Sequence, residues 1–155
     1  MNKINTKFIA ILGTVGVGKS TTIKYLIREL RLHNYYAVRV FIKAMHGPAY
    51  VIWFVIARLL GMPKKWAPYF YVMEAGYKPA RFLKVLSVYL DAFVSIPLKI
   101  LYIKVLNLLG FIVISEEYLP ASIYHHLYDY IRYGIKGNLA YFPLKIIYAF
   151  LMHYQ

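Results

Sequence analysis

Residues 7–20 read Lys-Phe-Ile-Ala-Ile-Leu-Gly-Thr-Val-Gly-Val-Gly-Lys-Ser, and this stretch decides the fold. Its first half is a continuous apolar run that ends at a glycine cluster, a pattern typical of a buried strand in a parallel sheet. Its second half fits the phosphate-binding loop, in which a glycine and any four residues precede Gly-Lys-Ser or Gly-Lys-Thr. That loop needs a strand before it and a helix after it. We therefore predict a strand, a phosphate-binding loop and a helix, in that order.

The residues after the loop supply the predicted helix and a second strand. From Ile23 to Leu30, apolar residues recur at i, i+3, i+4 and i+7 while basic residues take the other face, which predicts an amphipathic helix. His33-Asn34 interrupts this pattern, and residues 36–42 are rich in Val, Phe and Ile, as strands are. The order strand, helix, strand predicts parallel strands joined by a right-handed crossover.

The rest of the chain is mostly helical in pattern, with one further strand. Residues 62–79 carry three prolines and three basic residues, which indicates an exposed loop or a broken helix. The fold class we predict is α/β, a P-loop three-layer sandwich with a short parallel sheet of about three strands flanked by helices, in one domain over residues 1–155. The further elements are helices over 49–60, 80–93 and 97–109, a strand over 111–115, and helices over 120–133 and 143–153.

Composition excludes several classes of protein. Of the 155 residues 61% are apolar, so the chain is not a disordered tail, and it has no cysteine for a disulfide or a thiolate metal site. The longest stretch without Asp, Glu, Lys or Arg, Ala44–Ala57, has 14 residues and is shorter than the roughly 18 to 20 that cross a bilayer. No signal peptide is evident in the first residues, so we expect a cytoplasmic location. The net charge is +13, of which +10 lies in residues 1–79, and we expect it to attract a phosphate-rich ligand.

The loop motif assigns roles to consecutive residues. Its glycines let backbone N–H groups turn inward around a phosphate, and the helix N-terminus adds about half a positive charge there. Lys19 would bridge the β- and γ-phosphates of ATP as a catalytic cation, and Ser20 would place its hydroxyl on Mg²⁺. Thr21 would either contact the α-phosphate or have only a structural role in the helix. The predicted phosphate-binding residues are Gly13, Thr14, Val15, Gly16, Val17, Gly18, Lys19, Ser20 and Thr21.

A magnesium-dependent reaction also needs a carboxylate near the metal, and the chain holds only six. Glu116 and Glu117 alone stand at the carboxyl end of a predicted strand, which is where ligands bind in an open parallel sheet. We predict Glu116 as the catalytic, metal-side carboxylate, beside Ser20. Asp91 shares a predicted helix face with Arg81 and Lys84, so we expect a solvated ion pair there.

Residues 110–122, Gly-Phe-Ile-Val-Ile-Ser-Glu-Glu-Tyr-Leu-Pro-Ala-Ser, follow a helix-rich middle segment over 82–91. With the phosphate-binding loop, they resemble thymidylate kinase and related nucleoside monophosphate kinases. In that family the third strand ends in Asp-Arg-Tyr followed by serines. Tyr118 and Ser122 match, whereas Glu116 and Glu117 stand where the family has Asp and Arg. The family's Arg-Glu-Pro segment is replaced by residues 43–48.

The resemblance implies a protein that binds Mg²⁺ and ATP and transfers, or formerly transferred, the γ-phosphate to a nucleoside monophosphate. It places the acceptor near Lys43, His46 and Tyr118. The family continues through a lid and two further strands, and we expect this chain to lack them. A closed lid keeps water from the phosphate in kinases, so ATP binding is expected more than kinase turnover.

Other readings stay open. One is a noncatalytic P-loop protein whose basic, apolar first half docks on a membrane surface or a protein partner. Another is an incomplete kinase fragment, and a homodimer is a further possibility. No specific binding of nucleic acid is expected. His46 and His125-His126 lack companions at metal spacing, so we expect surface or half-buried histidines and no zinc site.

Overall fold

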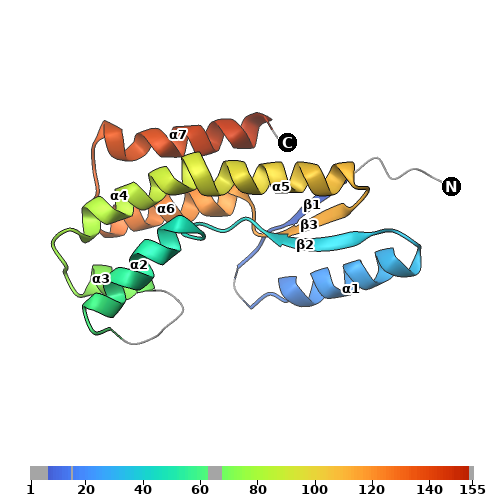
Figure 1. Ribbon diagram of the computed structural model, residues 1–155, viewed down its shortest axis with the longest axis horizontal. Coiled ribbons are helices and arrows are strands. Elements are labelled where there is room, and N and C mark those ends of the chain that lie inside the picture. The colour runs from blue at the N-terminus through green and yellow to red at the C-terminus, as the bar shows by residue number, and fades with distance from the viewer. Residues whose placement is uncertain (1–6, 15, 63–67, 154–155) are drawn as a thin grey trace. The chain divides into compact units, whose positions relative to one another are not determined.

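The computed structural model describes residues 7–14, 16–62 and 68–153, and Figure 1 shows their helices and strands as ribbons. The order of the described strands and helices along the chain is close to the one that the sequence predicts. The elements are β1 (Phe8–Ile11), α1 (Lys19–Leu32), β2 (Ala37–Phe41), α2 (Pro48–Leu59), α3 (Pro68–Glu74), α4 (Ala80–Leu90), the π-helical segment η1 (Asp91–Ser95), α5 (Ile96–Leu108), β3 (Ile112–Glu116), α6 (Leu119–Arg132) and α7 (Asn138–His153).

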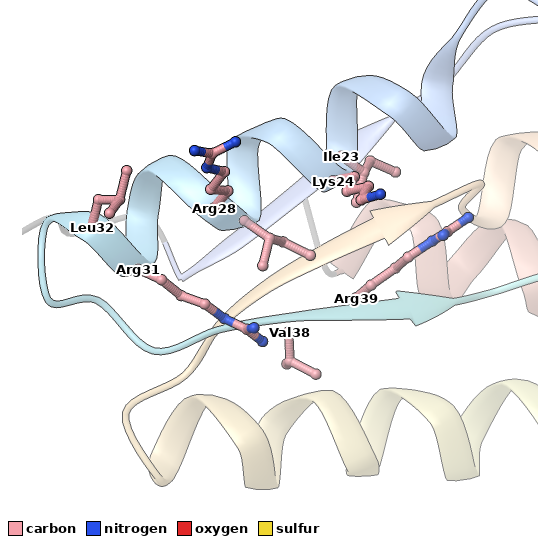
Figure 2. Close-up of a pocket in the computed structure, with 8 residues that line it drawn as sticks. Ile23, Lys24, Arg28, Arg31, Leu32, Val38 and Arg39 are labelled. Carbon is pink, nitrogen blue, oxygen red and sulfur yellow. The ribbon is translucent and has the colours of Figure 1, made fainter.

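The described strands form one parallel sheet in the order β1-β3-β2. β3 is therefore the central strand, and all five of its residues are buried. Helix α1 packs on one face of the sheet, and Figures 1 and 2 show the Leu98–Leu108 part of α5 on the opposite side. The predicted α/β sandwich with a short, three-stranded parallel sheet is confirmed.

The core between α1 and the sheet fixes which side chains face the helix. Ile23 of α1 packs with Ala37 of β2 and with Ile112 and Ile114 of β3. Because side chains alternate along a strand, Arg39 continues the α1 face of β2 and Glu116 that of β3. Two charged residues thus stand on the face that α1 covers, close to the carboxyl ends of their strands.

The chain forms two compact units. The first, Met1–Lys43 with Leu98–Ser122, contains the sheet, α1 and the phosphate-binding loop. The second, Ala44–Pro97 with Ile123–Gln155, is helical. The phosphate-binding loop and β3 therefore belong to one unit, although long segments of chain separate them.

Residues 80–108 form one helical run of 29 residues, where a break near residues 94–96 was expected. Instead of breaking, the run widens into η1 just before Pro97. A proline lacks the N–H that would close the preceding turn, and a π-helical turn accommodates this loss within the helix. The run is long and apolar enough to cross a membrane. Core helices of soluble proteins can have the same length and apolar composition.

Two other segments differ from expectation. The stretch expected as an exposed loop or broken helix contains the short helix α3, and it differs from expectation in that Val72 and Met73 of this helix are buried. Helix α7 begins at Asn138 and so includes Pro143, which was expected to start it. Pro143 has no N–H for the carbonyl of Leu139, and that carbonyl instead accepts a hydrogen bond of 2.9 Å from the Tyr89 hydroxyl. A hydrogen bond from a distant segment thus satisfies the helix carbonyl that Pro143 leaves without its usual donor.

Candidate functional site

The phosphate-binding loop connects β1 to α1 in the first unit. Gly16 and Gly18 have φ values of 88° and 85°, a region that side-chain-bearing residues rarely adopt. Gly18 ends the loop, and α1 starts at the next residue, so the free N–H groups of its first turn face the loop. Val15, a predicted phosphate-binding residue, lies outside the described residues. A glycine-rich turn that leads into a helix N-terminus is a backbone arrangement that can hold an anion.

The amine of Lys19 folds back onto the loop. Its Nζ donates hydrogen bonds to the carbonyls of Gly13, at 2.7 Å, and Thr14, at 2.6 Å. These bonds hold a cation beside the loop and the helix N-terminus. A phosphate held by the backbone N–H groups would meet this positive charge, as the sequence predicts for Lys19.

Ser20 and Glu116 come together although 96 residues separate them. Ser20 stands in the first turn of α1, and Glu116 ends β3, paired with Ile11 at the end of β1. The Ser20 hydroxyl donates a hydrogen bond of 2.6 Å to Glu116 Oε1. The juxtaposition expected from the sequence, a hydroxyl beside a strand-end carboxylate, is therefore present.

This pair fits Mg²⁺. The ion takes oxygen ligands and typically uses one or two protein groups, completing its shell with water and substrate phosphates. Ser20 Oγ and Glu116 Oε1 are such groups, next to a phosphate-binding loop. Among the described residues there is no group of three His, Asp or Glu that would hold a metal by itself. Binding here would thus depend on the phosphates.

Arg39, which no sequence motif singles out, also reaches this pair. Its Nη2 forms an ion pair with Glu116 Oε2 and donates to Ser20 Oγ at 3.3 Å. The guanidinium also lies over the ring of Phe41, with Cζ 4.4 Å from the ring centroid. The sequence did contain a signal for this contact. Arg39 and Phe41 are two residues apart in a predicted strand, so their side chains share one face of the sheet.

Glu117 has a strained backbone next to the pair. Its φ is 71°, which is uncommon for a residue other than glycine. Its Oε1 lies 3.6 Å from Lys43 Nζ, and its Oε2 is buried without a hydrogen-bond partner among the described residues. Strained residues and unsatisfied polar atoms concentrate at functional sites.

The predicted acceptor-side residues lie in different surroundings. Lys43 pairs with Glu117 in the first unit. Tyr118 is buried, and its ring packs on Phe8 with centroids 5.0 Å apart. His46 belongs to the second unit, where its Nδ1 is 2.9 Å from the carbonyl oxygen of Ala44. A role for the three residues in binding an acceptor stays a prediction.

Charged side chains are buried inside the second unit, contrary to two expectations. Asp91, expected in a solvated ion pair, is 1% exposed and lies 3.2 Å from His126 Nε2. Its Oδ2 also accepts a hydrogen bond of 2.5 Å from the backbone N–H of Met45. His126, expected at or near the surface, is fully buried. Lys84 is fully buried too and is ion-paired with Asp129.

These expectations were wrong because periodicity shows which residues share a helix face but not whether that face is buried. Asp91 does lie on one face with Lys84, but that face is turned into the unit. The signal was a line of polar residues along an otherwise apolar helix, at Lys84, Ser87, Asp91 and Ser95. All four are buried.

Burial of His126 predicts a stability that depends on pH. Loss of solvation lowers the pKa of His126 below its usual 6.5, although the hydrogen bond that its ring makes to Asp91 acts in the opposite direction. Below pH 6.5 the unfolded chain therefore binds a proton that the folded chain does not, and stability falls on acidification. The measurement is the free energy of unfolding in urea between pH 7.5 and 5.0. His126→Gln should lower the slope of this free energy against pH by up to about 1.4 kcal/mol per pH unit.

The adjacent His125 provides the control, since it is exposed. His125→Gln should leave the pH dependence close to that of the wild type. Equal pH dependence in wild type and His126→Gln would show that His126 does not titrate with folding.

A basic groove runs between α1 and β2 (Figure 2). In Figure 2, Arg31 reaches from α1 toward β2, and Arg39 extends along β2 toward the carboxyl end of β3. The groove contains cations and apolar side chains and no acidic residue. Its lining is Ile23, Lys24, Ile27, Arg28, Arg31, Leu32, Val38 and Arg39. Lys24, Arg28 and Arg39 also line a hollow that includes Ser20 and Thr21.

Comparison with known proteins finds a matching family. The family model described as "Helicase HerA, central domain" matches residues 1–133. The matched region contains the phosphate-binding loop, β3 with Glu116, and the basic groove. No curated protein and no solved structure matches the chain.

Proposed function

The chain belongs to the family of the helicase HerA central domain, a P-loop NTPase-type domain, and from this we propose that it binds Mg²⁺ and ATP and hydrolyses the ATP. The observation that carries the proposal is the position of the Ser20–Glu116 pair beside the phosphate-binding loop. A glycine-rich turn alone would need no carboxylate at that position. A phosphate loop with a hydroxyl and a carboxylate side by side has the parts that a metal-nucleotide complex needs.

Each residue of the site has a distinct task. The backbone N–H groups of the loop and of the first turn of α1 would hold the phosphates. Lys19 would neutralise charge that develops on the γ-phosphate, which is the main contribution that proteins make to phosphoryl transfer. Ser20 and Glu116 would hold Mg²⁺, which supplies further neutralisation of the phosphate charge when bound.

Glu117 is the best-placed residue to act on the attacking water. It is adjacent to Glu116, and its Oε2 is buried without a hydrogen-bond partner among the described residues. A carboxylate oxygen in that situation can accept a proton or a hydrogen bond from water. The strained φ of Glu117 fits a position maintained for function.

Transfer to a nucleoside monophosphate is not supported by the family match, which is to the HerA domain and not to thymidylate kinase. Hydrolysis needs only water as acceptor. The two reactions are distinguished by the product, because hydrolysis releases inorganic phosphate and a kinase forms a nucleoside diphosphate from the added monophosphate.

The proposed function is tested by titration calorimetry with ATP in millimolar Mg²⁺, followed by assays of phosphate release. The wild type is compared with Lys19→Ala, which removes the loop cation. Saturable binding with one site and steady phosphate release support the proposal. Wild-type protein that gives no binding heat and no phosphate contradicts it.

A second candidate function, binding of nucleic acid, is favoured by the basic groove. The matched family is described as a helicase domain, and helicases act on nucleic acids. Among the described residues the groove is lined by four cations and no acid, and of these cations Arg39 is also ion-paired with Glu116. Neutralising phosphates releases counterions, so such binding should weaken steeply with salt.

Replacing Lys24 and Arg28 with alanine should weaken this binding and lower its salt dependence. Both side chains are exposed, and loss of two phosphate contacts should lower the slope of log K against log[salt] by roughly 1.4 to 1.8. The measurement is fluorescence anisotropy with labelled single-stranded and duplex oligonucleotides between 50 and 200 mM salt.

The control is Lys136→Ala with Lys145→Ala, which removes the same charge from exposed positions of the second unit. An equal loss in both double variants would indicate a general effect of charge and no binding in the groove.

A further inference from the structure

Arg39 occupies the side of the site that a metal ion would use. Its Nη2 contacts both of the proposed Mg²⁺ ligands, by an ion pair with Glu116 Oε2 and a hydrogen bond of 3.3 Å to Ser20 Oγ. The positively charged guanidinium of Arg39 therefore already lies where Ser20 and Glu116 would bind Mg²⁺. The guanidinium stands in for the positive charge that Mg²⁺ would bring.

The fold holds this arginine in place. β2 pairs directly with β3, with Arg39 opposite Ile114 and Phe41 opposite Glu116. Arg39 thus lies diagonally across from Glu116, within reach of a long side chain on the same face. The ring of Phe41 lies against the guanidinium and supports it in this direction.

Arg39 also has space to leave. About a third of its side chain, 34%, is exposed. It lines the basic groove and also the hollow at Ser20 and Thr21. The side chain can therefore turn into solvent-filled space without disturbing the core, which consists of other residues.

From these contacts we infer that Arg39 is an internal cation that competes with Mg²⁺ for Ser20 and Glu116, and that Mg²⁺ and ATP bind only as Arg39 moves away. The inference rests on the proposed nucleotide site. Mg²⁺ and a guanidinium repel each other, and one nitrogen of Arg39 contacts both ligands, so both cations cannot hold this pair together. In the absence of nucleotide, Arg39 balances the charge of the buried Glu116 carboxylate.

The test compares wild type, Arg39→Gln and Arg28→Gln in calorimetric titrations with ATP, once with Mg²⁺ and once with EDTA. Arg28→Gln is the matched control, because it removes one positive charge from the same groove and hollow. We expect Arg39→Gln to bind Mg·ATP about five- to tenfold more tightly than wild type, since no cation must be displaced. With EDTA, the gain should disappear, and Arg28→Gln should show no gain in either buffer.

The possible outcomes separate this inference from the proposed function. Equal or weaker Mg·ATP binding by Arg39→Gln, in a wild type that binds, overturns the competition and leaves the nucleotide site standing. A gain that persists in EDTA also overturns it, because the metal would then be irrelevant. No binding by either protein contradicts the nucleotide site and the competition together. Binding by Arg39→Gln alone would support the inference in its strongest form.

A melting curve checks that the variants fold. Arg39→Gln leaves Glu116 without its ion pair and should melt at a lower temperature than wild type in EDTA. Mg·ATP should raise the melting temperature of Arg39→Gln by more than it raises that of Arg28→Gln.

Discussion

Replacing Lys19 with alanine should raise the dissociation constant for Mg·ATP about a hundredfold or more, so that binding is lost in calorimetry. The Lys19 amine is held at the loop by the carbonyls of Gly13 and Thr14. There it would form charge-assisted hydrogen bonds with the phosphates, each worth about 1.5 to 3 kcal/mol. Two such bonds amount to about 3 kcal/mol or more, and each 1.4 kcal/mol is a factor of ten in affinity.

Lys145→Ala is the control for this variant, because it removes a positive charge from an exposed position on α7, in the second unit. It should bind Mg·ATP as wild type does. Circular dichroism must show that Lys19→Ala is folded, since the amine also bonds to the loop backbone. Equal affinity in folded Lys19→Ala and wild type would refute the assignment of the loop as a nucleotide site.

Replacing Glu117 with glutamine should reduce the rate of ATP hydrolysis by about 10²- to 10⁴-fold, the usual contribution of a general base. Glutamine keeps the size of the side chain but cannot take a proton from water. Binding should persist, because the loop, Lys19, Ser20 and Glu116 are unchanged. Single-turnover phosphate release and titration with ATP, measured on the same preparation, separate the two effects.

Two further variants serve as comparisons for Glu117→Gln. Glu116→Gln should weaken Mg·ATP binding itself, because it removes the carboxylate on the metal side. Glu29→Gln changes an exposed glutamate on α1 and should alter neither binding nor rate. If Glu117→Gln hydrolyses ATP as fast as wild type, Glu117 serves only in its ion pair with Lys43.

Much of the candidate site could be predicted from the sequence because its central part is local. Gly18, Lys19 and Ser20 are adjacent, and the bonds of Lys19 reach back only five and six residues. Glu116 was predicted for the metal side of this site by a different route, and the structure places it 2.6 Å from the Ser20 hydroxyl. It follows a buried apolar run, and in a parallel sheet the carboxyl ends of the strands meet at one edge.

Other parts could not be predicted because they depend on which face of an element is covered. The sequence pattern places Lys84 of α4 and Asp91 of η1 on one helix face, but a face that meets solvent and a face that is buried have the same periodicity. His126 likewise follows an exposed neighbour, His125, and only packing shows that its ring is buried beside Asp91. The spacing of residues along the sequence does not indicate these contacts between distant helices.

The sequence by itself determined the strand, the loop and the helix of residues 7–32, since short-range backbone geometry and hydrogen bonds define them. It also determined that a strand-end carboxylate exists, because the chain has few acids and only one pair follows a strand. The tertiary structure decided the surroundings of that carboxylate. The strand order β1-β3-β2 places β2 beside β3, and so brings Arg39 to Glu116 and Ser20. Strand order follows from how the sheet packs against its helices, which no stretch of sequence encodes alone, and it placed a competing cation at the metal side of the site.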